Sequence, residues 1–209
     1  MREATFVDVD AIAHLHLLTF PGYFLSHLGW RFLRLFYAFF LVNENSHCIV
    51  AVDSNRVIGF VAGASDMIQH YRAFYRCKFV QIASMVVVRF LQDPVIRRES
   101  IKRVGHVRLA AAALLRPESQ SPAMQAGDSD QTPAQLLSIA VHPDYRGKGI
   151  AERLSDFFIS RLRSDGVRSI GLTVRSDNVR AIAFYKKDGW IVERTTSESM
   201  YFQRYIAEG

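Results

Sequence analysis

Hydrophobic and polar positions repeat with two different periods along this chain, and each period predicts one type of element. Short apolar runs and alternating apolar positions predict strands at 2–7, 47–52, 56–62, 136–141, 168–174, 190–195 and 199–205. Apolar positions at helical spacing predict helices at 9–18, 23–41, 67–91 and 94–115, and another that begins near residue 150. Strands and helices therefore interleave along the chain, which indicates an α/β fold with a mixed sheet.

Turn-forming and capping residues mark the ends of several of these elements. Asp8 is the expected N-cap of the first helix, whose apolar positions are Ile12, Leu15 and Leu18. The Phe-Pro-Gly sequence at 20–22 ends that helix, and we expect the aromatic-rich helix after it to face the core. The Asp-Ser-Asn sequence at 53–55 is expected to join two strands as a hairpin.

The interval between the strands at 56–62 and 136–141 has a composition of its own. We expect residues 66–134 to form a basic helical insertion followed by a flexible linker, with Asp93-Pro94 separating two helices. Residues 117–134 are rich in Pro, Ser, Gln, Gly and Asp, which is typical of linkers. Residues 67–116 contain ten Lys and Arg against two acidic residues, a charge of +8 in a chain whose net charge is +6. The basic character of the chain therefore resides in this segment.

Length and composition limit the class of protein. A chain of 209 residues with 49% hydrophobic content can bury one sizeable core, so we expect a single domain over 1–209. Charged residues interrupt its apolar runs before the ~20 residues of a membrane span, and its start lacks the pattern of a signal peptide. Cys48 and Cys77 show no metal-binding or redox spacing, so we expect reduced thiols. Together these features predict a cytoplasmic protein without a metal.

Residues 136–151 carry the strongest local signal for chemistry. An apolar strand is followed by a turn with two glycines and then by the start of a helix, where backbone N–H groups lack partners and the helix dipole is positive. Gly147 and Gly149 have no Cβ, and Arg146 and Lys148 add positive charge. This arrangement predicts a binding site for a phosphate or pyrophosphate. The spacing matches neither the nucleotide P-loop nor the dinucleotide fingerprint G-x-G-x-x-G.

The stretch Arg146–Ala151 resembles the [QR]-x-x-G-x-[GA] signature of the GNAT (Gcn5-related) N-acetyltransferase superfamily. A second block, Leu172–Trp190, is similar to the strand, Asn, helix and "FY…GW" segment of the same family. The clear resemblance covers about 135–195, with a weaker match at 2–64. It implies a mixed, mostly antiparallel twisted sheet flanked by helices. The insertion between the third and fourth strands departs from the simplest members of the family, in which a short turn joins them. It also implies acetyl-CoA as co-substrate.

The resemblance assigns roles to individual residues. The loop that would hold the pyrophosphate comprises Arg146, Gly147, Lys148, Gly149, Ile150 and Ala151. Backbone groups of Ile139, Ala140 and Val141 would pair with the pantetheine arm, and one of them would stabilise the developing oxyanion. Asn178 would contact the cofactor arm, and Tyr185 would contact it and protonate the departing thiolate. We also expect the turn at 20–23 to wall the amine pocket, with the side chains and backbone of Phe20, Pro21, Gly22 and Tyr23.

No general base can be assigned from the sequence. The related ribosomal-protein N-terminal acetyltransferases carry a glutamate at the position of Thr173, and threonine cannot act as a base near neutral pH. Ser138 lies where some relatives have an acidic residue and is kept as a candidate substrate-facing residue, although it is also a poor base. Histidine is a common general base, but His142 is placed in the turn beyond the strand. The amine could also lose its proton to water.

These observations lead to one main hypothesis and two alternatives. The main one is an enzyme that acetylates a primary amine of a small molecule, with an amino-sugar or other anionic acceptor favoured because the +8 segment would attract it. The first alternative is a protein or peptide amine as acceptor. The second is a peripheral membrane-associated, acyl-CoA-binding protein that uses 67–116 as a basic amphipathic surface. Nucleic-acid binding is not favoured because no known module accompanies the charge. The oligomeric state stays open.

Overall fold

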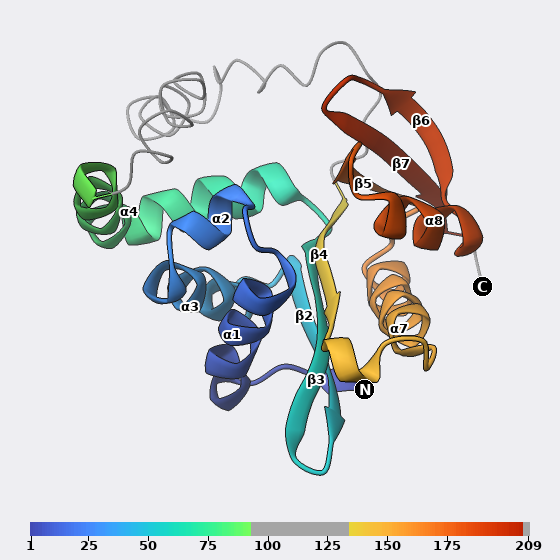
Figure 1. Ribbon diagram of the computed structural model, residues 1–209, viewed down its shortest axis with the longest axis horizontal. Coiled ribbons are helices and arrows are strands. Elements are labelled where there is room, and N and C mark those ends of the chain that lie inside the picture. Colours follow the sequence, from blue (N-terminus) through green and yellow to red (C-terminus); the bar gives the residue numbers. More distant parts are fainter. Residues whose placement is uncertain (93–133, 207–209) are drawn as a thin grey trace.

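A computed structural model describes residues 1–92 and 134–206 of the chain (Figure 1). The described elements follow one another in this order: β1 (Arg2–Glu3), α1 (Val9–Thr19), α2 (Phe24–His27), α3 (Trp30–Phe40), β2 (Ser46–Asp53), β3 (Arg56–Ala64), α4 (Met67–Gln92), β4 (Gln135–Val141), α7 (Ile150–Ser164), β5 (Ser169–Arg175), α8 (Val179–Lys187), β6 (Ile191–Thr195) and β7 (Ser199–Tyr205). Short 3₁₀ turns at Phe6–Asp8 and Pro143–Tyr145 precede α1 and α7.

The described strands form one seven-stranded sheet in the order β1-β2-β3-β4-β5-β7-β6. All neighbours are antiparallel except β4 and β5, which are parallel and are paired in register only at Gln135 opposite Gly171. The backbone N–H of Gly171 donates to the carbonyl of Ala134 at 2.9 Å and strengthens this one junction. Because the pairing stops there, β4 and β5 separate toward their carboxyl ends. The expectation of a mixed, mostly antiparallel sheet is confirmed.

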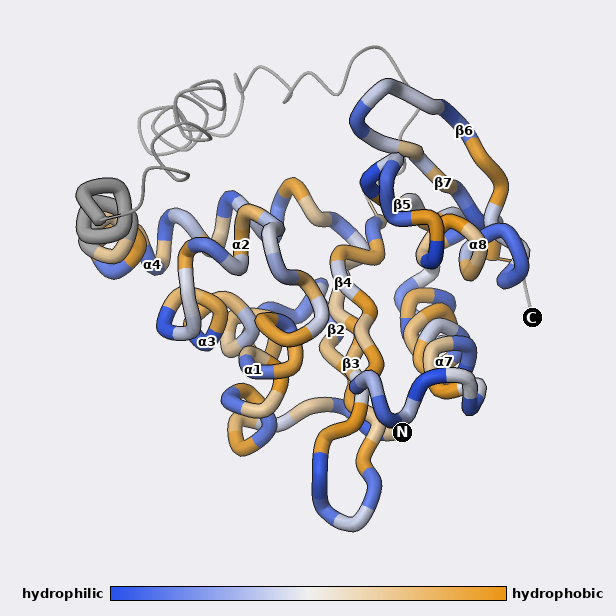
Figure 2. Tube along the Cα trace, in the orientation of Figure 1, coloured by the Kyte–Doolittle hydropathy of each residue, from blue (hydrophilic) through white to orange (hydrophobic). Residues whose placement is uncertain are grey.

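Two hydrophobic cores lie on opposite faces of the central strands. The first, between the sheet and helices α1, α3 and α4, is rich in fully buried aromatic rings: Phe36, Tyr37, Phe40, Phe60 and Phe74. The second is built by α7 against β2 to β5 and β7, around Leu154, Phe158, Leu162, Leu172 and Phe202. Figure 2 shows the apolar residues of the central strands between these helices. The two cores fix α1 on one face of β4 and α7 on the other.

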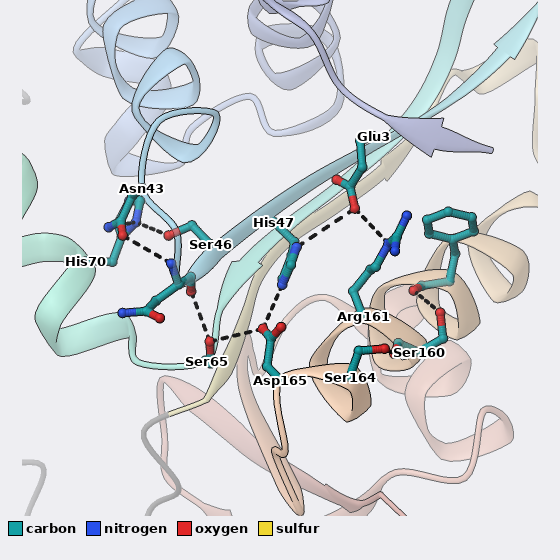
Figure 3. A network of polar contacts seen from close by, with 12 residues as sticks. Glu3, Asn43, Ser46, His47, Ser65, His70, Ser160, Arg161, Ser164 and Asp165 are labelled. Atoms are coloured by element: carbon teal, nitrogen blue, oxygen red, sulfur yellow. Dashed lines mark hydrogen bonds and ion pairs between the residues drawn. The ribbon is translucent and has the colours of Figure 1, made fainter. Parts of the chain in front are cut away.

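A network of polar contacts anchors the carboxyl end of α7 to the strands (Figure 3). The imidazole of His47 on β2 lies 2.7 Å from a carboxylate oxygen of Asp165, directly after α7. One turn earlier, the Arg161 guanidinium pairs with Glu3 of β1 at 2.9 Å. The Ser65 hydroxyl, after β3, donates to the same Asp165 carboxylate at 3.3 Å. These contacts fix the axis of α7, so its amino end is held in place beside β4.

The structure corrects four details of the sequence-based expectations. The first strand is only Arg2–Glu3, and the helix expected at 23–41 is two helices separated at Gly29, whose φ of +83° is left-handed. Leu18 is not a core residue, because 52% of it is exposed. Asp8 occupies the expected N-cap position of α1, but its carboxylate makes no capping hydrogen bond there and instead accepts from the backbone N–H and hydroxyl of Thr5.

Other local expectations agree with the structure. The hairpin at 53–55 is a tight turn in which Ser54 and Asn55 have φ of +45° and +67°, as a type I′ connection requires. The helix expected at 67–91 is α4, Met67–Gln92. The helix expected at 94–115, the Asp93-Pro94 break and the linker at 117–134 lie outside the described residues. Among the residues that the structure describes, no helix is long and apolar enough to span a membrane.

Candidate active site

The loop between β4 and α7 leads directly into the amino end of α7 and leaves the first backbone N–H groups of that helix without partners. Gly147 and Gly149 have φ of +76° and +70°, so the chain turns sharply into α7, and Gly149 occupies the N-cap position without a side-chain cap. A Cβ on either glycine would meet no atom within 4 Å, so the backbone conformation, not crowding, requires glycine here. Gly149 is followed by Ile150, Ala151 and Glu152, whose N–H groups have no intrahelical partner and face outward at the positive end of the dipole.

Two arginines from distant segments add positive charge at this loop. The Arg146 Nε donates to the carbonyl of Val141 at 3.2 Å, which holds the loop against the end of β4. Partial desolvation, and then the positive charge of Arg180 on α8, lower the pKa of Arg146 from its ordinary value. Lys148 lies over the Tyr145 ring, with Nζ 4.9 Å from the ring centroid. Since like charges repel, an anion between the arginines would relieve their repulsion.

The edge of β4 that faces β5 has backbone groups that no neighbouring strand pairs with. On its other edge β4 pairs with β3, with Val61 opposite Ile139, Phe60 opposite Ala140, and Gly59 opposite Val141. On the side of β5, the described residues pair in register only at Gln135. The backbone groups of 139–141 that point toward β5 therefore have no strand partner. An extended amide-bearing chain could hydrogen-bond there as an additional strand would.

Tyr185 lies on α8 and is 6% exposed. Its ring packs between Trp190 and Phe202, at centroid distances of 5.7 and 5.6 Å. Burial, with a smaller contribution from the nearby Tyr23 hydroxyl, raises the pKa of the Tyr185 phenol well above its ordinary value. The phenol therefore keeps its proton at neutral pH and can serve as a proton donor.

Asn178 links α8 to the amino-terminal half of the chain. Its side-chain oxygen accepts from the Ala181 N–H at 3.1 Å and caps α8, while its side-chain nitrogen donates to the Tyr23 hydroxyl at 3.1 Å. The Tyr23 ring packs against Phe20 at 5.4 Å and lies 5.3 Å from the guanidinium carbon of Arg175, at the end of β5. The turn at 20–23, with Pro21 and Gly22 exposed at its tip, is thus placed beside Asn178 and Tyr185.

The candidate bases are spread over the length of β4. Ser138 is buried on the side of the first core, within hydrogen-bonding reach of the Tyr37 hydroxyl, which in turn lies 2.7 Å from His16 Nδ1. His142 lies just beyond the carboxyl end of β4, where its Nε2 is 3.3 Å from an Arg56 nitrogen. Thr173 is exposed on β5. Neither Ser138 nor His142 faces the junction between β4 and β5.

Sequence reasoning missed two cations of this site, Arg175 and Arg180. Both flank Asn178 in the sequence block that carries the second motif, and this proximity was the available signal. Their placement over Tyr23 and beside Arg146 depends on contacts between segments far apart in sequence, which no local pattern reports. In the described part of the chain, no group of three or more His, Cys, Asp or Glu side chains is arranged to hold a metal ion.

Comparison with known sequences finds similarity in the same region. Residues 96–190 match the model of the acetyltransferase (GNAT) family. The [ribosomal protein bS18]-alanine N-acetyltransferase of Escherichia coli (strain K12) is 40% identical over 57 residues, which are 27% of this chain and 38% of that protein. The mycothiol acetyltransferase of Propionibacterium freudenreichii subsp. shermanii is 35% identical over 69 residues, 32% of this chain and 22% of that protein. The chain thus spans well under half of the length of these relatives.

Solved structures resemble the whole chain at low sequence identity, so they bear on the fold alone. SsHAT aligns with a TM-score of 0.64 at 23% identity, covering 99% of this chain and 98% of that one. The PaiA N-acetyltransferase of Thermoplasma acidophilum, solved in complex with coenzyme A, aligns with a TM-score of 0.57 at 13% identity over 98% and 96% of the two chains. The chain is therefore similar in sequence to the GNAT acetyltransferase family over residues 96–190, and its fold is similar to that of these solved structures.

Proposed function

We propose that this protein is an N-acetyltransferase, which moves the acetyl group of acetyl-CoA to a primary amine by direct attack. The observation that carries the proposal is the separation of β4 from β5. The amino end of α7, where we place the pyrophosphate, follows the carboxyl end of β4, and the buried Tyr185 on α8 would be the proton donor. The pyrophosphate would bind at Arg146 to Ala151 with Arg180 beside it, and the pantetheine arm would extend back along 139–141.

The residues of the site supply the steps of this reaction. A backbone N–H of β4 polarises the thioester carbonyl and stabilises the negative charge that develops on its oxygen. The amine nitrogen attacks the carbonyl carbon, a C–N bond forms, and the C–S bond breaks. Tyr185, protonated at neutral pH, donates its proton to the departing thiolate. Asn178 holds α8 against Tyr23 and so keeps the phenol at the flank of the split.

Two classes of amine are supported by different observations. The +8 charge of 67–116 supports a small anionic acceptor such as an amino-sugar, because the field would raise its encounter rate. Arg72, Arg76, Lys78 and Arg89 of this segment lie on α4, and the other six lie outside the described residues. The similarity to an enzyme named for the alanine of ribosomal protein bS18 supports a peptide amine as the second candidate. A thiol-release screen with acetyl-CoA and three probes, glucosamine 6-phosphate, spermidine and an alanine-starting hexapeptide, separates these classes.

The acetyl-CoA site is tested by Gly149→Asp. The substitution places a negative side chain at the loop and a Cβ on a left-handed residue, so acetyl-CoA affinity measured by calorimetry should fall at least ~10-fold, since the new carboxylate repels the pyrophosphate. Gly166→Asp is the matched control, because Gly166 follows the other end of α7 with a similar φ of +78° and equally open surroundings. Equal affinities for wild type and Gly149→Asp would remove the basis of the proposal.

A further inference from the structure

A cavity of about 560 Å³ lies beside α1, on the face of the sheet opposite α7. Its lining comes from one face of α1, the start of the chain, the β2–β3 hairpin and the residue after β4. The hairpin, which projects past the helices in Figure 1, forms one wall. Leu15 and Val57 of the lining pack in the first core. None of the described lining residues belongs to 139–141 or 146–151, so the cavity is separate from the proposed acetyl-CoA site.

Much of the lining of this cavity is apolar. Ala11, Leu15 and Leu18 follow one another at helical spacing on α1 and line the cavity together with Val57 of β3. Leu18 is exposed to solvent, and so is Val7 in the turn before α1, which lines the same cavity. Cavities of this size with a largely apolar lining and a few polar groups are typical of sites for small organic molecules. An apolar ligand body would remove Leu18 and Val7 from water.

One positive charge in this cavity lacks an opposite charge. Arg2 donates two hydrogen bonds to the Asp8 carboxylate, at 2.6 and 2.8 Å, and this pairing lowers the pKa of Asp8 to about 2. Both residues line the cavity, and their charges cancel. The other cation in the described lining is Arg56, which has no carboxylate partner among the described residues. With His14 and His142 neutral, the net charge of the lining is therefore that of Arg56.

Two donors face the ring of His142, but the neutral ring can accept from only one of them. The Arg56 guanidinium nitrogen lies 3.3 Å from Nε2, and the backbone N–H of Asp144 donates to Nδ1 at 3.4 Å. Guanidinium and backbone N–H groups only donate, and a neutral imidazole accepts at one nitrogen. The Asp144 carboxylate lies 3.6 Å from Nδ1, too far for a hydrogen bond. In either tautomer, one donor at this ring therefore lacks an acceptor.

We propose that this cavity binds a small organic monoanion, a carboxylate carried on an apolar body. The carboxylate accepts from Arg56 and from Nε2–H of His142, while Nδ1 keeps the hydrogen bond from Asp144. The planar fork of a guanidinium matches a carboxylate, and a single uncompensated cation favours a monoanion over a phosphate dianion. The apolar body lies against Leu18 and Val57. The inference does not depend on the proposed acetyltransferase function.

The test is a titration of the full chain with phenylacetate and with phenylacetamide, which has the same body without the charge, followed by NMR chemical shifts. Phenylacetate should bind at least ~10-fold more tightly than phenylacetamide, because hydrogen bonds between charged groups are stronger than neutral ones. Arg56→Gln should weaken phenylacetate binding at least ~10-fold and leave phenylacetamide unchanged. Arg194→Gln is the matched control, since it removes an equally exposed arginine from β6, outside the cavity, and should keep the wild-type affinity.

A second variant tests the apolar part of the site. Leu18→Asn should weaken phenylacetate binding at least ~3-fold, because the ligand body loses an apolar contact, whereas Ile191→Asn, at an exposed position of β6, should not. Leu18 and Arg56 are both exposed, so we expect these variants to fold. The inference is overturned if phenylacetate shows no saturable binding in the millimolar range expected for a ligand of its size. Equal binding of the acid and the amide, or an affinity that either Arg56→Gln or Leu18→Asn leaves unchanged, would also overturn it.

Discussion

At the scale of single residues, the environment of Tyr185 determines what it can do. The phenol is surrounded by Trp190 and Phe202, and burial raises its pKa, so it is a donor at neutral pH and not an acceptor. A ring packed in this way also supports the second core. The two roles can be separated, because removal of the hydroxyl alone leaves the ring in place.

We expect Tyr185→Phe to keep the fold and lose turnover. Without its hydroxyl the residue cannot protonate the thiolate, so the single-turnover rate should fall ~10²-fold or more, while acetyl-CoA affinity stays within about threefold. Stopped-flow thiol release measures the rate, and calorimetry measures the affinity. Tyr205→Phe is the control, since Tyr205 is an exposed residue at the end of β7. A Tyr185→Phe enzyme as fast as wild type would assign this tyrosine to packing alone.

At the scale of elements, β3 carries two glycines that allow β4 and α7 to approach closely. A Cβ on Gly63 would collide with the carbonyl oxygen of Gln135 and lie 2.5 Å from Cζ of Phe158 in α7. A Cβ on Gly59 would be 3.0 Å from the carbonyl oxygen of Ala140, a milder contact. Gly63 faces the end of β4 at which β5 is joined, so close packing there fixes where the split begins.

Gly63→Ala should therefore destabilise the protein more than Gly59→Ala. Overpacking against backbone typically costs 1–3 kcal/mol, and we expect about 3 kcal/mol for Gly63→Ala and about 1 kcal/mol for Gly59→Ala. Urea titration followed by circular dichroism gives both free energies of unfolding. Equal losses for the two variants would show that the gap at Gly63 relaxes without strain and that β3 does not fix the split.

At the scale of the whole molecule, two buried histidines tie helices to the first core. His16 of α1 contacts the Tyr37 hydroxyl through Nδ1, and His70 of α4 contacts the Ser46 hydroxyl at 2.6 Å. In the described part of the chain, Nε2 of both rings is buried without a hydrogen-bond partner. Burial lowers the pKa of both His16 and His70 to about 4. Protonation would place an uncompensated charge in the core.

Stability should therefore fall with acid between pH 6.5 and 4. In this window the unfolded chain binds protons at both rings and the folded protein does not, so the free energy of unfolding rises with pH; the full contribution is present above pH 6.5. Each ring contributes at most about 3 kcal/mol. Urea titrations at pH 7, 5.5 and 4.5 measure the slope. His70→Gln should reduce it, whereas His14→Gln, at an exposed position, should not. A His70→Gln slope equal to that of wild type would contradict the assignment.

Local sequence was sufficient to predict those elements whose structure depends on backbone conformation and on the period of the apolar positions. The strand at 136–141, the glycine turn and the start of α7 agree with the structure because turn geometry and helix starts depend on neighbouring residues only. The same holds for the hairpin at 53–55. The single helix predicted at 23–41 was wrong at Gly29. The apolar pattern continues across this residue, but its positive φ separates α2 from α3.

By itself, the sequence determined the order of the elements, the conformation of the glycine loop and the resemblance to the GNAT acetyltransferase family, since each depends on short-range spacing. Tertiary structure decided what surrounds those residues. Arg180 comes near Arg146, and Asn178 bonds to the Tyr23 hydroxyl, only after α8 and the turn at 20–23 have packed on the sheet. These contacts join segments that are far apart in the chain. Which side chains meet depends on the order of the strands and on the positions of bulges, and local periodicity encodes neither.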